Sequence, residues 1–76
     1  MTDKQILNNE IDNLLNQMEI SKDLKNCLVW CKTQRASKSV YKLVHFGCRK
    51  ILKRESTNPK SELTLLYLID FTNKRF

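Results

Sequence analysis

With 76 residues and a net charge of +6 at pH 7, the chain is long enough for one small domain and basic enough to attract anionic partners. No apolar run reaches roughly 18 residues, so we expect no membrane-spanning helix, and the N-terminus has no basic start followed by an apolar block that would predict a secretory signal. A single Gly and a single Pro disfavour a β-rich fold, because such folds need many tight turns.

The charge is unevenly distributed along the chain. Residues 1–20 contain one base and four acids, for a net charge of −3, whereas residues 21–76 contain thirteen bases and four acids, for +9. We therefore expect a weakly acidic first helix and a basic body that could meet phosphate, in RNA, DNA or a phosphopeptide, or an acidic protein surface.

Two helices are predicted in the first half of the chain, at about residues 3–18 and 22–34. Their apolar residues recur at spacings of one, three and four, and each set forms a single stripe. Thr2 or Asp3 can cap the first helix and Ser21 the second, because short side-chain oxygens accept hydrogen bonds from free first-turn N–H groups. The predicted inward-facing residues are Ile6, Leu7, Ile11, Leu14, Leu15, Met18, Leu24, Cys27, Leu28 and Cys31.

A third helix is predicted at about residues 39–54, with Ser37 or Ser39 as its cap. Gly47 falls on its apolar side, and close approach of another helix is a plausible reason for a residue that costs about 1 kcal/mol relative to Ala. The other apolar residues on that side are Val40, Leu43, Val44, Cys48, Ile51 and Leu52.

Asn58-Pro59 is the clearest helix start in the chain, since a capping residue precedes Pro at the first helical position. The fourth helix is predicted to run from about residue 59 to residue 74. Short connections between consecutive helices indicate packed antiparallel neighbours. The predicted fold is therefore all-α, a compact array of four helices in one domain.

Cysteine and histidine do not form a recognisable site. The three cysteines are an odd number without a secretory signal, so we expect free, mostly buried thiols in an intracellular, reducing compartment. Cys27 and Cys31 lie one helical turn apart, but zinc would need further ligands and only His45 is available. His45 is predicted to lie at the surface or at the boundary of the core. No Gly-rich phosphate loop or nucleophile with a base is present, so we expect a non-enzymatic protein without a cofactor.

The third predicted helix carries a basic stripe opposite its apolar side. This stripe is either an ordinary solvated helix face or a surface that contacts phosphate groups. In the second case, its affinity for the phosphate-bearing partner should fall steeply with salt. The aromatic residues do not interleave with these charges in an RNA-binding pattern, and Trp30 is interpreted as a core or boundary aromatic rather than a stacking platform. The stripe consists of Lys38, Lys42, Arg49 and Lys53.

Tyr67 and Asp70 are three positions apart and share a face of the fourth predicted helix, after Leu63 and Leu66 and before Lys74. Two interpretations remain open. The pair is either satisfied inside the core, or it forms a polar spot in an apolar groove that receives a peptide.

Residues 62–70, with the sequence ELTLLYLID, resemble the fourth-helix signature of the RNA polymerase II CTD-interacting domain, found in transcription-termination and RNA-processing factors. Residues 23–35 and 40–52 resemble the second and third helices of that family more loosely, and Asn58-Pro59-Lys60 falls where the family has a basic, Pro-containing link. The related ENTH and VHS trafficking domains have a similar Leu-Thr-Leu-Leu run and remain competitors.

The resemblance implies the first part of a right-handed superhelix and a groove for an extended CTD peptide. Tyr67 and Asp70 would line that groove, with Asp70 accepting a hydrogen bond from a peptide hydroxyl and Lys74 following on the same face. The start of the second helix, at Ser21 and Lys22, would border it. A nuclear location is implied as well.

The later helices of the family are missing from this chain, and with them the Arg that meets phosphoserine. The fourth helix is buried all round in the family, so a monomer would expose part of Leu65, Leu68, Ile69 and Phe71. We therefore expect self-association or a partner chain. The leading hypothesis is a peptide-binding or assembly module in transcription or RNA processing. The alternatives are a small basic nucleic-acid-binding protein that uses the basic stripe and an ENTH/VHS-like trafficking adaptor.

Overall fold

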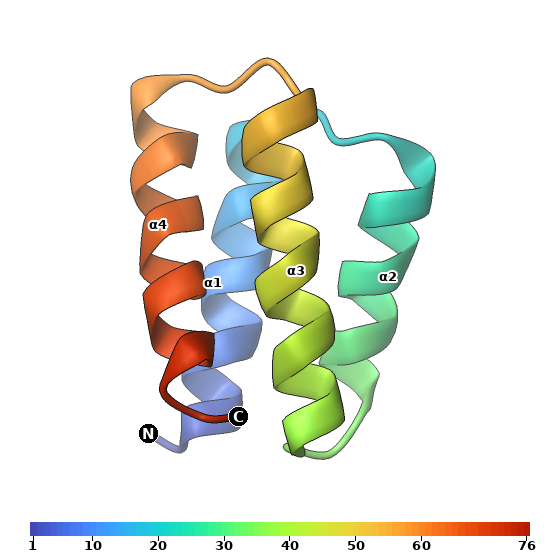
Figure 1. The fold of residues 1–76 in the computed structure, drawn as a ribbon, viewed down its shortest axis with the longest axis vertical. Helices are drawn as coiled ribbons and strands as arrows, with labels where there is room; N and C mark the ends of the chain where they lie inside the picture. The colour runs from blue at the N-terminus through green and yellow to red at the C-terminus, as the bar shows by residue number, and fades with distance from the viewer.

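The computed structural model describes all residues from 1 to 76 and contains four α-helices and no strand. The helices are α1 (Asp3–Gln17), α2 (Lys22–Thr33), α3 (Lys38–Arg54) and α4 (Pro59–Asn73), and consecutive helices run in opposite directions (Figure 1). The prediction of an all-α, compact, four-helix fold is confirmed, and each predicted helix boundary lies within one residue of the observed one. No helix has the length and apolar composition needed to cross a membrane.

Capping residues explain where α1 and α4 begin. The Thr2 hydroxyl accepts a hydrogen bond from Gln5 N at 3.2 Å, and Gln5 Oε1 accepts one from Thr2 N at 2.8 Å. Asn58 and Ser61 form the same reciprocal arrangement at the start of α4, at 2.9 and 3.0 Å. Each pair satisfies backbone donors that a helix start otherwise leaves free, so these two boundaries are encoded locally.

The starts of α2 and α3 differ from each other. Ser37 caps α3 by accepting a hydrogen bond from Val40 N at 3.2 Å. Ser21 occupies the predicted cap position of α2, but its side chain makes no capping hydrogen bond. Its backbone N–H instead donates to Glu55 Oε1 at 2.8 Å, which joins the α1–α2 connection to the α3–α4 connection.

The helices close into a ring. Helix α1 packs against α2 and α4, and α3 packs against the same two helices, whereas the diagonal pairs α1–α3 and α2–α4 make no contact. The core lies inside this ring and draws residues from all four helices. Closure of α1 onto α4 makes the domain a four-helix bundle measuring 29 × 21 × 19 Å, where the family resemblance implied the start of a superhelix. The fully or almost fully buried core residues are Leu7, Ile11, Leu14, Leu28, Cys31, Val40, Tyr41, Val44, Cys48, Ile51, Leu65, Leu68 and Phe71.

The expected exposure of Leu65, Leu68 and Phe71 is wrong, and only Ile69 is partly exposed. Leu65, Leu68 and Phe71 are buried, and Ile69 is partly buried, because α1 and α3 cover α4 from two sides. Leu65, Leu68 and Phe71 therefore give no reason to expect self-association. The apolar side chains that α4 does expose are a different set, on its outward face.

Two ring side chains lie where the sequence did not predict them. His45 is buried rather than at the surface, with only 4% of its surface exposed, because it points from α3 towards α4. Trp30 is exposed rather than in the core or at its boundary. On the α2 helix Trp30 lies about 100° from Cys31 and about 200° from Leu28, and these two buried residues define the inner face.

Candidate functional site

The outward face of α3 is the most strongly charged surface of the molecule. Six basic residues and no acidic residue occur within α3, and all six side chains are exposed. Four of them form the predicted basic stripe, and Lys50 and Arg54 lie on the same helix surface. The sequence could have indicated Lys50 and Arg54 as well, because the whole helix contains no acidic residue. The cationic face is defined as Lys38, Lys42, Arg49, Lys50, Lys53 and Arg54.

None of the cationic-face side chains is neutralised by an ion pair. The three ion pairs of the molecule join Lys32 to Asp12, Lys74 to Asp70 and Arg75 to Asp3, all outside α3. The acid nearest to the cationic face in sequence is Glu55, which accepts the hydrogen bond from the Ser21 backbone N–H. That bond lowers the pKa of Glu55 below its ordinary value and directs its carboxylate towards the start of α2. The positive charge of the face is therefore available to a partner.

One aromatic side chain interrupts the cationic face. Phe46 lies one helical turn after Lys42 and one turn before Lys50, and 49% of its surface is exposed. Phe46 therefore lies among the charges on the helix surface. Neighbouring positions in the sequence do not reveal this arrangement, because the ring and the two cations are four residues apart along α3.

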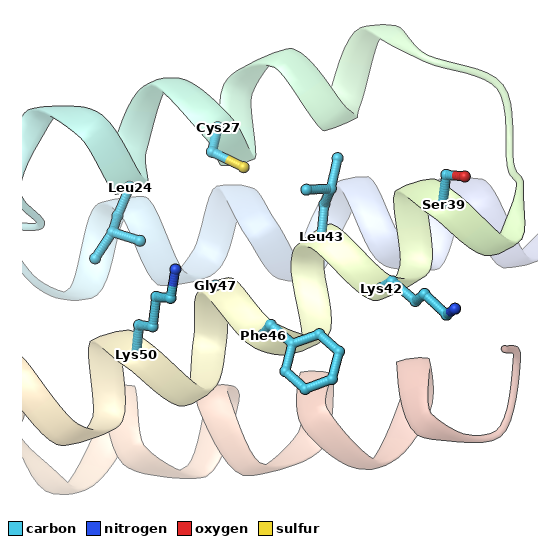
Figure 2. A pocket seen from close by; sticks show the side chains of 8 residues that line it. All are labelled: Leu24, Cys27, Ser39, Lys42, Leu43, Phe46, Gly47 and Lys50. Atoms are coloured by element: carbon cyan, nitrogen blue, oxygen red, sulfur yellow. The ribbon is translucent and has the colours of Figure 1, made fainter.

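A groove of about 440 Å³ runs between α2 and α3 beside Phe46 (Figure 2). Leu24 and Cys27 line it from α2, and Leu43 projects towards them from α3, partly exposed rather than buried as the sequence suggested. The walls are thus mainly apolar, while Lys42 and Lys50 stand towards its two ends. Such a groove can hold a flat apolar group that carries negative charge on either side.

Gly47 forms part of the groove and is buried against α2, as its position on the apolar side predicted. A Cβ atom at this position would meet Leu28 Cδ2 at 4.0 Å, which is ordinary van der Waals contact. The helices therefore approach closely here, but the space does not require glycine.

A second hollow, of about 400 Å³, adjoins Phe46 and is lined mainly by basic residues. Phe46 is the only apolar residue in its lining, so the ring borders both the apolar groove and a strongly basic surface. The remaining lining residues are Arg49, Lys50, Lys53 and Arg54.

The structure brings together Tyr67, Asp70 and Lys74, which the sequence assigned to a peptide groove. All three line a shallow hollow at the C-terminal end of α4, and Asp70 pairs with Lys74 at 3.2 Å. Tyr67 and Asp70 are exposed and share no hydrogen bond, so a pair satisfied inside the core is ruled out. The Tyr67 ring instead stacks on Phe71, with centroids 5.9 Å apart.

Ser21 and Lys22, the other two predicted groove residues, lie elsewhere. They mark the start of α2, at the opposite end of the bundle from the C-terminal end of α4 (Figure 1). Because α2 and α4 are diagonal in the ring and make no contact, these residues do not border the hollow at Tyr67. The five residues therefore do not form one groove within this domain.

Exposed apolar residues also gather on the outward face of α4. Leu63 is 71% exposed, Leu66 is 52% exposed and Tyr67 is 46% exposed. Their spacing of three and four positions places them side by side on the helix surface. The α4 apolar patch is defined as these three residues, and Asp70 continues it by one turn.

The thiols offer no charged nucleophile in the core. Burial raises the pKa values of Cys31 and Cys48 to about 12, so both remain protonated at neutral pH. Cys27 is the half-exposed thiol of the three and lines the α2–α3 groove. No three Cys, His, Asp or Glu side chains lie together in an arrangement that could hold a metal ion.

Comparison with known proteins gives no relative for this chain: no family model matches, and neither a curated protein nor a solved structure does. The resemblance to CTD-interacting, ENTH and VHS domains therefore stands on the residues in which it was found.

Proposed function

We propose that this protein is a non-enzymatic nucleic-acid-binding module whose cationic face contacts phosphate groups. The observation that carries the proposal is the set of six exposed cations on α3, none of which is ion-paired. Nucleic acid offers phosphates at regular intervals, and release of their counterions favours binding to such a row of charges. At 1.5 Å per residue the 17 residues of α3 span roughly 25 Å, enough to follow several phosphates.

The basic residues outside α3 differ from those of the cationic face, because several of them have partners within the domain. Lys32, Lys74 and Arg75 are ion-paired. Lys4 Nζ donates to the Lys32 carbonyl oxygen at 2.9 Å, at the C-terminal end of α2. The free positive charge is therefore concentrated on one helix, as expected for an electrostatic binding surface.

Fluorescence anisotropy with a labelled oligonucleotide, measured over a range of salt concentrations, tests this proposal. If the face neutralises about four to six phosphates, log Kd should rise with log salt with a slope of roughly 3 to 5. Failure to bind any single-stranded or duplex probe at low salt would contradict the function.

A matched pair of variants separates a local surface from bulk charge. Lys42→Gln, Arg49→Gln and Lys53→Gln together remove three charges from the cationic face, whereas Lys25→Gln, Arg35→Gln and Lys60→Gln remove three from elsewhere. The first triple variant should lose most of the affinity and reduce the salt slope by about 2 to 3. The second should bind nearly as the native protein does, and equal losses would indicate nonspecific charge attraction.

We propose as a second function that the α4 apolar patch binds a peptide or protein partner. Three large apolar side chains exposed side by side favour this, since such clusters often mark protein contact sites. The resemblance to CTD-interacting domains makes the RNA polymerase II CTD the first peptide to try. The Asp70–Lys74 pair is solvent-exposed, so a peptide hydroxyl could displace Lys74 at little cost. Both proposed functions suit a nuclear protein of transcription or RNA processing.

NMR titration with phosphorylated and unphosphorylated CTD heptad peptides tests the second function. Amide shifts should change at Leu66, Tyr67 and Asp70 and not at Ser21, which lies at the far end of the bundle. Light scattering on the free protein decides whether another copy covers the patch, since a monomer has a mass of 9.0 kDa. Unchanged shifts together with a monomeric mass would contradict a role for this patch in binding the CTD or a second copy.

A further inference from the structure

We infer that the cationic face is suited to single-stranded nucleic acid, with Phe46 stacking on an unpaired base at the α2–α3 groove. This inference rests on the nucleic-acid function proposed above and specifies which form of nucleic acid the surface takes. It makes DNA and RNA strands equivalent, since base stacking and phosphate contact are available in both.

The Phe46 ring lies between two cations of α3. Lys42 and Lys50 lie one turn before and one turn after Phe46 on the exposed surface of α3. In a single strand, phosphates flank every base, so a base placed on Phe46 puts its neighbouring phosphates close to these two cations. A half-exposed aromatic ring between cations is the combination that sequence-tolerant single-strand binding requires.

The Phe46 ring is held in place by neighbouring aromatic rings. Phe46 packs edge-on against His45, with centroids 5.0 Å apart, and lies 6.1 Å from the ring of Phe76. His45 is itself anchored, because Nδ1 lies 3.1 Å from the Ile69 carbonyl oxygen and 3.2 Å from Thr72 Oγ1. The supported ring offers a stacking surface without having to be ordered by the ligand first.

The α2–α3 groove has a shape and polarity that suit a base. Leu24, Cys27 and Leu43 provide apolar walls between α2 and α3, and the space of about 440 Å³ is ample for one base. Phe46 also lines this groove, at its edge, and its ring points away from α2 (Figure 2). The Lys50 side chain reaches towards α2 at one end, and Lys42 extends along α3 at the other (Figure 2). Apolar walls with a cation towards each end complement a base between two phosphates.

Duplex nucleic acid cannot use this arrangement. Bases inside a duplex are stacked on their neighbours and expose only their edges, so Phe46 would have no base face to contact. A duplex would meet the cations alone. The structure therefore predicts that the aromatic ring adds affinity for single strands and adds nothing for duplexes.

Anisotropy measurements with three probes and two matched variants test this inference. The probes are a mixed-sequence single strand, made as DNA and as RNA, the corresponding duplex, and inorganic polyphosphate, which carries phosphates without bases. The variants are Phe46→Leu, which keeps an apolar side chain but removes the aromatic face, and Trp30→Leu, which removes an exposed ring outside the cationic face.

Phe46→Leu should weaken binding to both single strands by roughly tenfold and leave the duplex and polyphosphate affinities unchanged. Trp30→Leu should leave all affinities unchanged. Thermal unfolding of each variant verifies that the domain is folded at the assay temperature. Phe46→Trp, made in a Trp30→Phe background, should retain single-strand affinity and show quenching of its fluorescence on binding.

The outcomes distinguish this inference from the proposed function. If folded Phe46→Leu loses no single-strand affinity, or loses polyphosphate affinity equally, then base stacking is refuted while the phosphate-binding function stands. If the native protein binds no probe, both fall together.

Discussion

At the scale of single residues, the three cysteines show how burial sets chemistry. Cys27 and Cys31 are one turn apart on α2, yet Cys31 is buried and Cys27 borders the groove. Desolvation favours the neutral thiol, and it raises the pKa of Cys31 and of Cys48 to about 12. The thiolate is the reactive form, so the two buried thiols should be inert in the folded protein.

We predict that Ellman's reagent at pH 8 labels only Cys27 quickly in the folded protein and all three thiols after unfolding in urea. Because the two buried thiols have raised pKa values, the folded state favours their protonated form. Their contribution to the free energy of unfolding is complete below pH 9 and is lost between pH 9 and about 12. Rapid labelling of a second thiol in the folded state would show that the core opens more readily than described.

His45 and Trp30 show the limit of residue-by-residue prediction. The residue types predict that His45 lies at the surface or core boundary and that Trp30 lies in the core or at its boundary. Instead, His45 is buried and Trp30 is exposed. His45 is buried because a carbonyl and a hydroxyl of α4 satisfy its Nδ1, and the carbonyl requires that this nitrogen carry the proton. Both partners are more than twenty residues away in sequence, so no local pattern reveals them.

At the scale of elements, α3 combines two surfaces on one helix. Its inner side supplies Val40, Val44, Cys48 and Ile51 to the core, and its outer side supplies the cationic face. The helical period alone separates these two sets, which is why both were recognisable in the sequence. Gly47 is the one residue of α3 that disfavours the helix without a steric need for it.

Gly47→Ala should therefore stabilise the domain by about 0.5 to 1 kcal/mol. The added Cβ would be 4.0 Å from Leu28 Cδ2, so the gain in helix propensity is not offset by a clash. Urea unfolding followed by circular dichroism should show a higher midpoint with an unchanged m-value. A lower midpoint would mean that α2 packs more tightly over this position than the contact distance implies.

Helix α4 illustrates the opposite case, in which an element cannot be interpreted by itself. In the family that this segment resembles the helix is buried all round, yet here Leu63, Leu66 and Tyr67 face solvent. The structure gives α4 two neighbours, α1 and α3, and leaves its outer face open because α2 is diagonal to it. The number and placement of neighbours, rather than hydrophobicity, decide which of its residues are covered.

At the scale of the whole molecule, the closed ring depends on contacts between the two ends of the chain. Arg75 Nε donates to Asp3 Oδ2 at 3.0 Å, and Arg75 Nη1 donates to the Phe71 carbonyl oxygen at 2.6 Å. The guanidinium also lies 3.6 Å from the centroid of the Phe71 ring. One side chain thus connects the end of α4 to the start of α1 by an ion pair, a hydrogen bond and a cation–π contact.

Arg75→Ala should lower the urea midpoint of unfolding, because these contacts and the packing of the aliphatic stem are lost together. Lys74→Ala is the matched control. It removes only an exposed ion pair to Asp70 and should change stability by no more than about 0.5 kcal/mol. Similar midpoints for the two variants in urea would show that the Arg75 contacts do not help to close the bundle.

The amino-acid sequence by itself determined the helices, their boundaries, most of the core and the basic character of α3. Those features depend on capping pairs such as Thr2 with Gln5 and on apolar spacing within a helix, and both are local interactions. Only the tertiary structure decided that α1 closes over α4, that Ser21 and Lys22 lie far from Tyr67, and that Phe46 stands on a free cationic surface. These outcomes depend on which helices become neighbours, and contacts between residues far apart in sequence determine that arrangement.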